Sequence, residues 1–356
     1  MPPKIPAPTP RVLRADPSAL NGPDARTAVA EAARMLRAGG LVAIPTETVY
    51  GLAANALDSA AVRRIFTAKG RPSFNPLIAH VPNVEGARAL VAVWPEAAAR
   101  LAAAFWPGPV TLVLPKRPGV VPDEVTAGLP AVAVRVPAHP AALAVLRAAG
   151  VPLAAPSANR YTELSPTRAE HVVRTLGAAV DLVLDGGPTG VGIESTVVDL
   201  TGVADGSGPP RLLRPGTVSP DALTQVLGIS VVAAPPPAAA DAPRLAPGMV
   251  ERHYAPRAAL RVFESGAGAT AAAWVADARA RRPGLRAGAL LLAPWVERAP
   301  VEHTVLMPAD AAGYARRLYA ELHALDAAGC DVVLVERPPA GAEWAGVRDR
   351  LARAAR

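Results

Sequence analysis

Polar side chains able to bind an anion and a small polar molecule gather in two neighbouring stretches of the chain. They comprise two hydroxyls and a carboxylate, then two cations and an amide: Thr46, Glu47, Thr48, Lys69, Arg71 and Asn75. The first three follow a short apolar run, residues 41–44, that is typical of a buried strand. Because ligands of α/β proteins bind beyond the carboxyl ends of strands, the sequence predicts a binding site here.

Two residues of this region have a plainer alternative reading. Lys69 is one of only three lysines in a chain whose other basic side chains are arginine, which draws attention to its compact ammonium. A solvated lysine at a helix C-terminus is the alternative, and it is the commoner case for a lone lysine. His80 lies in the strand-like residues 77–81 and is either a satisfied core histidine or a site residue.

Further polar clusters stand at the ends of predicted strands. Ser157 and Asn159 follow one strand, and the glycine-rich residues 185–192 lead directly into Glu194, Ser195 and Thr196. Arg135 and Arg214 each end a strand before a proline. Each cluster alone could be a turn or a solvated rim. Together, at the strand ends of one domain, they indicate a cleft for a phosphate-bearing ligand and a small polar substrate.

Several common chemistries are excluded by the motifs. No Walker A motif occurs, and Ser157 is not in a Gly-x-Ser-x-Gly elbow. The single cysteine, Cys330, reads as a buried apolar residue, and the six histidines show no metal-ligand spacing, so no metal site is expected. Residues 266–271 match the dinucleotide fingerprint only superficially, because the next strand lacks the acidic residue at its end.

The charge of the chain favours anionic partners. Its 356 residues carry a formal net charge of +7, which suits nucleotides, phosphates or RNA, although no block of like charges forms a basic arm. The N-terminus lacks the apolar core of a signal peptide, and no apolar run is long enough to span a membrane. We therefore expect a cytoplasmic protein without membrane contact.

The elements that must position these side chains divide into two α/β domains. Residues 12–228 interleave strands and helices without a regular βαβ period, which predicts a twisted, mixed sheet. Its strands are expected at 41–45, 77–81, 110–114, 132–136, 153–155, 180–184, 196–200 and 212–213, and its helices at 24–38, 58–69, 95–105, 140–149 and 166–176. Residues 229–257 form a predicted Pro/Ala-rich linker. Residues 258–356 predict a small Rossmann-like domain with a parallel sheet.

Several of these motifs, in this order, closely resemble the YrdC-type threonylcarbamoyl-adenylate synthases. They are Pro45–Leu52, Lys69-Gly-Arg-Pro72 with Asn75-Pro-Leu77, Pro156–Asn159, Ser165-Pro-Thr167, Glu194–Asp199 and Leu213–Gly216. In addition, Pro247-Gly-Met249, His253–Pro256 and Asp349–Ala355 resemble the longer, two-domain branch of that family. The resemblance thus spans nearly the whole chain.

The resemblance implies a nucleotidyl transfer that joins L-threonine, bicarbonate or CO2, and ATP into threonylcarbamoyl-AMP and pyrophosphate. The product would feed the N6-threonylcarbamoyladenosine modification of tRNA through a downstream transferase, and direct contact with tRNA is possible but not required. Mg2+ is expected with ATP, and no other cofactor.

The resemblance also assigns roles to particular residues. Lys69 and Arg71 are the expected catalytic cations. Threonine would be held by Thr48, His80, Arg135, Ala155 and Ser195. ATP would be held by Arg71, Asn75, Ala131, Ser157, Ser165, Arg214 and Tyr254. Thr46, Asn159 and His253 are secondary candidates. Lys69 is expected near the phosphates, Arg135 is expected to clamp a carboxylate, and His253 and Tyr254 are expected to close over the cleft.

Two other functions stay open from the sequence alone. One is a carbamoyltransferase built on a related domain, and the other is a module that binds double-stranded RNA without chemistry. The chain also departs from the family pattern after Ser-Ala-Asn. The family often has glycine there, whereas this chain has Arg160, Tyr161, Thr162 and Glu163, which leaves the conformation of that loop open.

Overall fold

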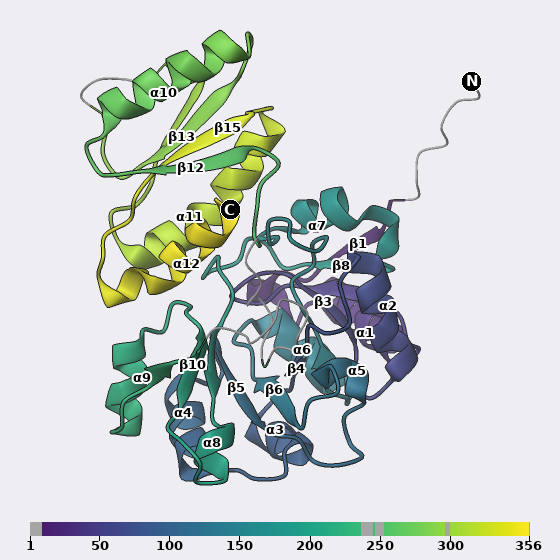
Figure 1. The fold of residues 1–356 in the computed structure, drawn as a ribbon. Coiled ribbons are helices and arrows are strands. Elements are labelled where there is room, and N and C mark those ends of the chain that lie inside the picture. The colour runs from purple at the N-terminus through teal and green to yellow at the C-terminus, as the bar shows by residue number, and fades with distance from the viewer. Residues whose placement is uncertain (1–8, 236–244, 246–252, 296–299, 356) are drawn as a thin grey trace.

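The computed structural model describes residues 9–235, 245, 253–295 and 300–355. In these residues the chain forms two sheets, each with its own helices, and the smaller unit sits against one side of the larger (Figure 1). The sequence-based prediction of a mixed α/β domain followed by a small domain with a parallel sheet is confirmed.

The large sheet has eleven strands in the order β1-β8-β2-β3-β7-β4-β6-β5-β9-β10-β11. The strands are β1 (Arg11–Arg14), β2 (Val42–Ile44), β3 (Gly51–Asn55), β4 (Ile78–His80), β5 (Val110–Pro115), β6 (Ala131–Arg135), β7 (Leu153–Ala154), β8 (Leu182–Asp185), β9 (Thr196–Asp199), β10 (Arg211–Arg214) and β11 (Val232–Ala233). Parallel and antiparallel neighbours alternate irregularly. In the centre, β4 pairs in parallel with β6, which sets His80 opposite Arg135.

Helices cover both faces of this sheet. They are α1 (Pro23–Arg37), α2 (Ser59–Lys69), α3 (Val84–Leu90), α4 (Glu96–Phe105), α5 (Asp123–Thr126), α6 (Pro140–Ala149), α7 (Ala169–Leu176), α8 (Thr201–Ala204) and α9 (Pro220–Leu227). The apolar side chains of α1 and α6 form one core cluster with β2 and β8, and those of α2 and α4 belong to the main cluster on the sheet. Asp58 caps α2 by accepting from the amides of Ala60 and Ala61, and Gly70 ends it in the left-handed conformation.

Several elements were absent from the prediction. Residues 51–55, treated as part of a loop, form β3, and the proline-flanked residues 11–14 form the edge strand β1. Helices α3 and α9 were missed, although Ser219, Pro220 and Gly228 are clear start and stop signals for α9. The predicted helix 166–176 begins only at Ala169. In addition, β11 pairs with β10 inside residues 229–257, which were predicted to be a linker.

The small sheet has the order β12-β15-β13-β14 and is parallel throughout. Its strands are β12 (Ala259–Phe263), β13 (Ala287–Leu291), β14 (His303–Leu306) and β15 (Val332–Glu336), and its helices are α10 (Gly268–Arg281), α11 (Ala311–Ala327) and α12 (Ala345–Ala354). Helix α10 covers the outer face, whereas α11 and α12 lie toward the large domain (Figure 1). Cys330 is buried, as predicted.

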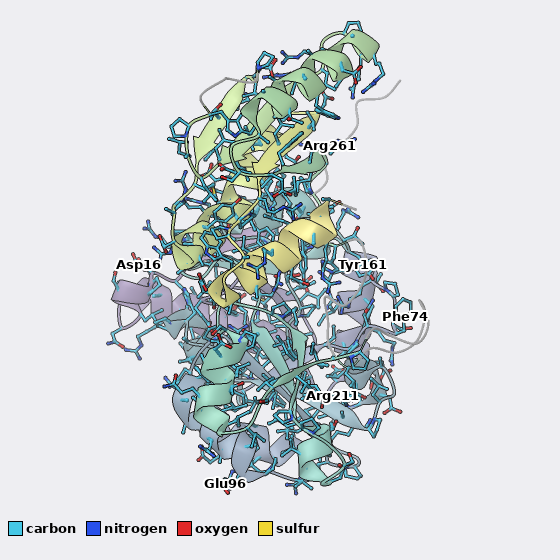
Figure 2. All side chains as sticks on the ribbon, turned by 60° about the vertical axis from the view of Figure 1, so that its left-hand side comes forward. Asp16, Phe74, Glu96, Tyr161, Arg211 and Arg261 are labelled. Atoms are coloured by element: carbon cyan, nitrogen blue, oxygen red, sulfur yellow. The ribbon has the colours of Figure 1, made fainter. Side chains whose placement is uncertain are left out.

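The junction of the two domains is filled by side chains. Figure 2 shows Tyr161 at the level where they meet. The buried rings of His171 and His323, one from each domain, stack with centroids 3.9 Å apart. Across the parts of the chain that the structure describes, no helix is long and apolar enough to cross a membrane.

Candidate active site

One cavity gathers the polar residues of the large domain. It is lined by the loop after β2, by β4, β6 and the loop after β7, by residues 194–195 and 214, and by the chain that enters the small domain. Of the predicted site residues it contains Thr46, Thr48, Arg71, His80, Arg135, Ala155, Ser157, Ser195, Arg214, His253 and Tyr254. The prediction that these separate clusters meet at strand ends therefore agrees with the geometry.

At one end of the cavity, Arg135 is buried and already engaged. Its Nε donates to the carbonyl of Gly108 at 3.1 Å, one terminal nitrogen donates to Thr48 Oγ1 at 3.0 Å, and the other lies 2.5 Å from Glu47 Oε1. Glu47 Oε2 also accepts from the amide of Ala138. Burial alone would raise the pKa of Glu47, but Arg135 outweighs it and holds that pKa below its usual value. Glu47 is thus a site residue that the sequence-based assignment omitted.

The imidazole of His80 is neutral. Burial lowers its pKa to about 3, with Arg135 adding to the effect. Its Nδ1 lies 3.2 Å from the carbonyl of Ile78, which can only accept, so this contact favours the tautomer that carries the proton on Nδ1.

Hydrogen bonds within the loop after β2 fix its shape. The hydroxyls of Thr46 and Thr48 lie 2.8 Å apart, and Thr46 Oγ1 donates to the carbonyl of Val49. The buried hydroxyl of Tyr50 donates to the carbonyl of Gly187 at 2.7 Å and accepts from the amide of Gly186. The glycine-rich loop is thereby tied to the first polar cluster.

At the other end of the cavity stand two buried guanidinium groups. Arg214 donates from Nε to the carbonyl of Ser195 and from a terminal nitrogen to its hydroxyl, both at 3.0 Å. Arg71 donates to the carbonyls of Asn75 and Pro76, and its guanidinium lies 5.9 Å from the centre of the Tyr161 ring. Burial lowers the pKa of Arg71 to about 10, which leaves it charged at neutral pH.

Lys69, which is expected near the phosphates, is not among the residues that line the cavity. It is buried at the end of α2, and its ammonium lies 2.5 Å from both the Ser157 and the Asn159 carbonyl. Burial and the nearby Arg71 lower its pKa well below the usual value. In this arrangement Lys69 holds the loop that carries Ser157.

Four other assigned residues are absent from the cavity lining. The hydroxyl of Ser165 bonds to Glu194, Asn75 donates to Tyr161, Asn159 donates to the carbonyls of Arg160 and Glu163, and Ala131 begins β6. In the described part of the chain, the Oδ1 atoms of Asn75 and Asn159 are buried without a hydrogen-bond partner. The loop that lacks the family's glycine is closed by Asn159, and Thr162 takes a left-handed φ of 70° there.

The end of the predicted linker does reach the cavity. His253 and Tyr254 are both buried, and the ring of Tyr161 meets that of His253 edge to face at 5.9 Å. Tyr254 has a φ of 60°, an uncommon conformation for a residue other than glycine. The motif at 247–249 lies outside the described residues.

Glu194, which lines the cavity, is a second carboxylate that received no role from the sequence. Its partners are Tyr319 and Arg350 of the small domain, at 3.1 and 2.6 Å from Oε2. Burial would raise the pKa of Glu194. The positive charges of Arg350 and, to a smaller extent, Arg214 outweigh this effect of burial and lower the pKa below its usual value. Within the described ranges, no three His, Cys, Asp or Glu side chains are grouped to hold a metal ion.

The fold and the cavity define a two-domain α/β protein with a site lined by buried basic and polar side chains. The family model described as "Telomere recombination" matches residues 34–216, and the model described as "Threonylcarbamoyl-AMP synthase, C-terminal domain" matches residues 218–356. The chain belongs to this Sua5–YciO–YrdC family, in the branch that carries the Sua5 C-terminal domain.

Named relatives support this membership along the whole chain. A threonylcarbamoyl-AMP synthase of Schizosaccharomyces pombe is 37% identical over 93% of this chain and 89% of its own length. One of Pyrococcus abyssi is 50% identical over 65% of this chain and 67% of its own length. The crystal structure of P. abyssi Sua5 complexed with L-threonine superposes with a TM-score of 0.85, covering 97% of both chains at 37% identity.

Proposed function

We propose that this protein is an L-threonylcarbamoyladenylate synthase. It condenses L-threonine, bicarbonate or CO2, and ATP into threonylcarbamoyl-AMP and pyrophosphate. The observation that carries the proposal is the composition of the cavity. Arg135, Thr48 and the neutral His80 stand at one end, and Arg71 and Arg214 stand at the other. Relatives named for this activity match both domains.

We assign the Arg135 end to threonine. A guanidinium has five N–H donors, and three are used by Gly108, Thr48 and Glu47, so one N–H remains on each terminal nitrogen for a substrate carboxylate. Such a pair fits a carboxylate in a bidentate manner. His80 Nε2 accepts a hydrogen bond from the threonine amine or hydroxyl, because neutral imidazole retains a lone pair there.

The reaction then needs positioning more than a covalent nucleophile. The uncharged amine of threonine adds to CO2 and loses a proton, giving a carbamate. A carbamate oxygen attacks the α-phosphorus of ATP, the bond to the β-phosphate oxygen breaks, and pyrophosphate leaves. Arg71 and Arg214 offset the negative charge of the phosphates, and Ser157 supplies a hydroxyl. ATP enters as its Mg2+ complex, with the ion held mainly by phosphates and water.

Residues outside the lining support this site indirectly. Lys69 fixes the loop of Ser157, and the buried Oδ1 of Asn75 offers an acceptor beside Arg71. His253 and Tyr254 exclude water from the mixed anhydride, which water would hydrolyse. The product is the substrate of a separate transferase that modifies tRNA, and this step requires no direct contact between this protein and tRNA.

Detection of the product tests the proposal. The protein is incubated with ATP, Mg2+, L-threonine and 13C-bicarbonate, and the products are separated by mass spectrometry. We expect an adduct that contains AMP, threonine and one labelled carbon. Hydrolysis of ATP without that adduct would contradict the proposal. The match of both domains to named synthases favours it over the carbamoyltransferase and RNA-binding alternatives.

A further inference from the structure

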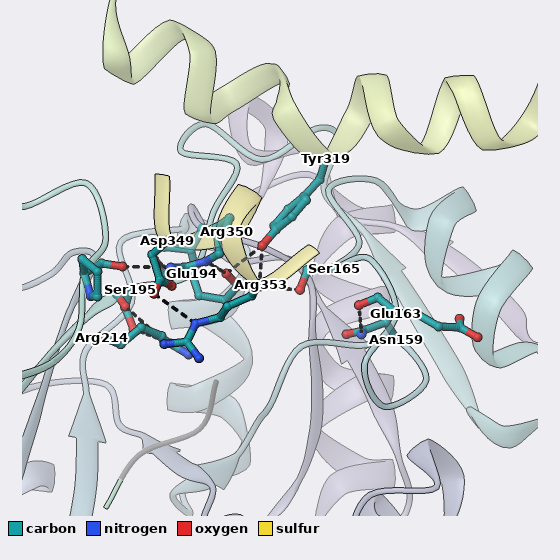
Figure 3. A network of polar contacts seen from close by, with 12 residues as sticks. Asn159, Glu163, Ser165, Glu194, Ser195, Arg214, Tyr319, Asp349, Arg350 and Arg353 are labelled. Atoms are coloured by element: carbon teal, nitrogen blue, oxygen red, sulfur yellow. Dashed lines mark hydrogen bonds and ion pairs between the residues drawn. The ribbon is translucent and has the colours of Figure 1, made fainter. Parts of the chain in front are cut away.

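A carboxylate in the cavity of the large domain takes its charge partner from the small domain. Figure 3 shows Tyr319 pointing from α11 toward Glu194, with Arg350 of α12 beside it. Arg350 Nε lies 2.6 Å from Glu194 Oε2, and the Tyr319 hydroxyl lies 3.1 Å from the same oxygen. Another nitrogen of Arg350 donates to the carbonyl of Pro215 at 2.9 Å. The Arg350 side chain is 1% exposed, so this is a fully buried ion pair.

The surrounding interface is closely fitted at the same place. A β-carbon on Gly346 of α12 would lie 2.4 Å from the carbonyl oxygen of Gly216, and one on Gly192 would lie 2.3 Å from the carbonyl oxygen of Ala315. Arg316 Nε donates to the carbonyl of Gly190 at 2.9 Å. The small domain therefore rests on residues 190–194 and 215–216, which directly adjoin Ser195 and Arg214 of the cavity.

The charges nearby give this contact a role. Glu194 interacts electrostatically with both Arg350 and Arg214. A buried carboxylate without a partner is strongly unfavourable. If Arg350 were absent, Glu194 would turn its charge to Arg214, which is the cation that we assign to the nucleotide.

We propose that Arg350 and Tyr319 are positioning residues of the active site, which hold the Glu194 carboxylate so that it does not compete with the phosphates of ATP for Arg214. The small domain is then an integral part of the nucleotide site. This inference rests on the proposed function, because it concerns the ATP end of the same cavity.

The test compares the full-length protein with R350M, Y319F, E194Q and E194Q/R350M. Two quantities are measured: the Kd of a non-hydrolysable ATP analogue by calorimetry, and the KM values and kcat of threonine-dependent pyrophosphate release. We expect R350M to raise the Kd and the KM for ATP about tenfold, with the KM for threonine changed less than about twofold. In the E194Q background position 194 carries no charge, and Asp349, the other carboxylate beside Arg350, keeps its pair with Arg353, so R350M should add less than about twofold.

The control is R348M on the same helix, because Arg348 donates to the carbonyls of Pro339 and Gly341, both within the small domain. It should keep the wild-type Kd. Wild-type Kd in R350M, or an equal loss with and without E194Q, would overturn the inference. If R350M does not fold, Y319F serves as the test, because it removes only one hydroxyl. We expect Y319F to raise the Kd of the ATP analogue about threefold, and an unchanged Kd would overturn the inference. If the wild-type protein shows no threonine-dependent release of pyrophosphate, the proposed function is refuted. The calorimetric comparison of ATP-analogue binding does not depend on that activity, so it still tests the inference separately.

Discussion

The guanidinium of Arg135 lies 2.5 Å from the carboxylate of Glu47, so the cation assigned to the substrate carboxylate also holds a carboxylate of the protein itself. Both side chains are largely buried, with exposed fractions of 4% and 13%. The pair fixes the plane of the guanidinium and leaves two N–H groups for a ligand. Preorganisation of this kind reduces the ordering that binding requires.

Replacement of Arg135 by Ala tests this arrangement. We expect the KM for threonine to rise at least about tenfold, because two charge-assisted hydrogen bonds are lost. The KM for ATP should change much less. The variant should also lose stability, by about 3–5 kcal/mol, because Glu47 is left buried without a partner. The double variant with Glu47→Gln should regain stability but not threonine affinity, and an unchanged KM for threonine would refute the clamp.

Replacement of Lys69 by Met separates support of the loop from contact with phosphate. Two buried carbonyls would lose their donor, at about 1–3 kcal/mol each, so we expect a lower free energy of unfolding in urea and weaker ATP binding. Lys116→Met is the matched control, since Lys116 pairs with Asp123 away from the cavity. A Lys69→Met protein of wild-type stability with a greatly reduced kcat would favour the direct phosphate contact that the sequence predicted.

Acid should destabilise the protein through its buried histidines. Burial lowers the pKa of His80 to about 3 and that of His323 to about 4, whereas an unfolded chain titrates near about 6.5. Between these values the unfolded state binds more protons, so stability present at neutral pH is lost as the pH falls. Each histidine contributes up to about 1.4 kcal/mol per pH unit. Urea unfolding at pH 7.5 and 5.0 should show the loss, and His323→Gln should reduce it. Equal stability at the two values would contradict the burial effect.

A larger side chain in place of Gly346 at the domain junction should weaken ATP binding, although Gly346 does not line the cavity. Gly346→Val places carbon atoms against the carbonyl of Gly216, which we expect to cost about 1–3 kcal/mol of stability and to raise the KM for ATP. Gly190→Ala is the control, because nothing lies within 4 Å of its added β-carbon. Thermal unfolding and steady-state kinetics of both variants check this. A wild-type unfolding temperature and a wild-type KM for ATP in Gly346→Val would contradict this prediction, because the two domains could then move apart at the junction without effect on the nucleotide site.

The sequence predicts those parts of the site that lie in short segments at strand ends. One cavity is lined by Arg135, Arg214, Ser157 and Ser195, because the ends of their strands meet at the edge of the sheet. Each of these strand ends can be recognised from a short stretch of sequence. The expected contact of Lys69 with phosphates stays a prediction, and the sequence did not reveal that its ammonium bonds to the carbonyls of Ser157 and Asn159.

Longer-range partners escape such reasoning. Arg350 is 156 residues from Glu194 in the chain, and only the docking of the two domains brings them together. Only a weak indication of this pair is present in the sequence: Glu194 lies in a largely apolar segment that is expected to be buried, and no cation near it in the sequence could be its partner. Strand β3 was missed for a related reason: residues 51–55 contain no β-branched or aromatic side chain, and they form a strand because β2 and β7 flank them.

The most direct measurement of the central claim is pyrophosphate release from MgATP and bicarbonate by the wild-type protein, with and without L-threonine and with L-serine as a control. We expect release that depends on both bicarbonate and threonine, with serine a poorer substrate. Release that is indifferent to the amino acid, or no release by the folded protein, would contradict it.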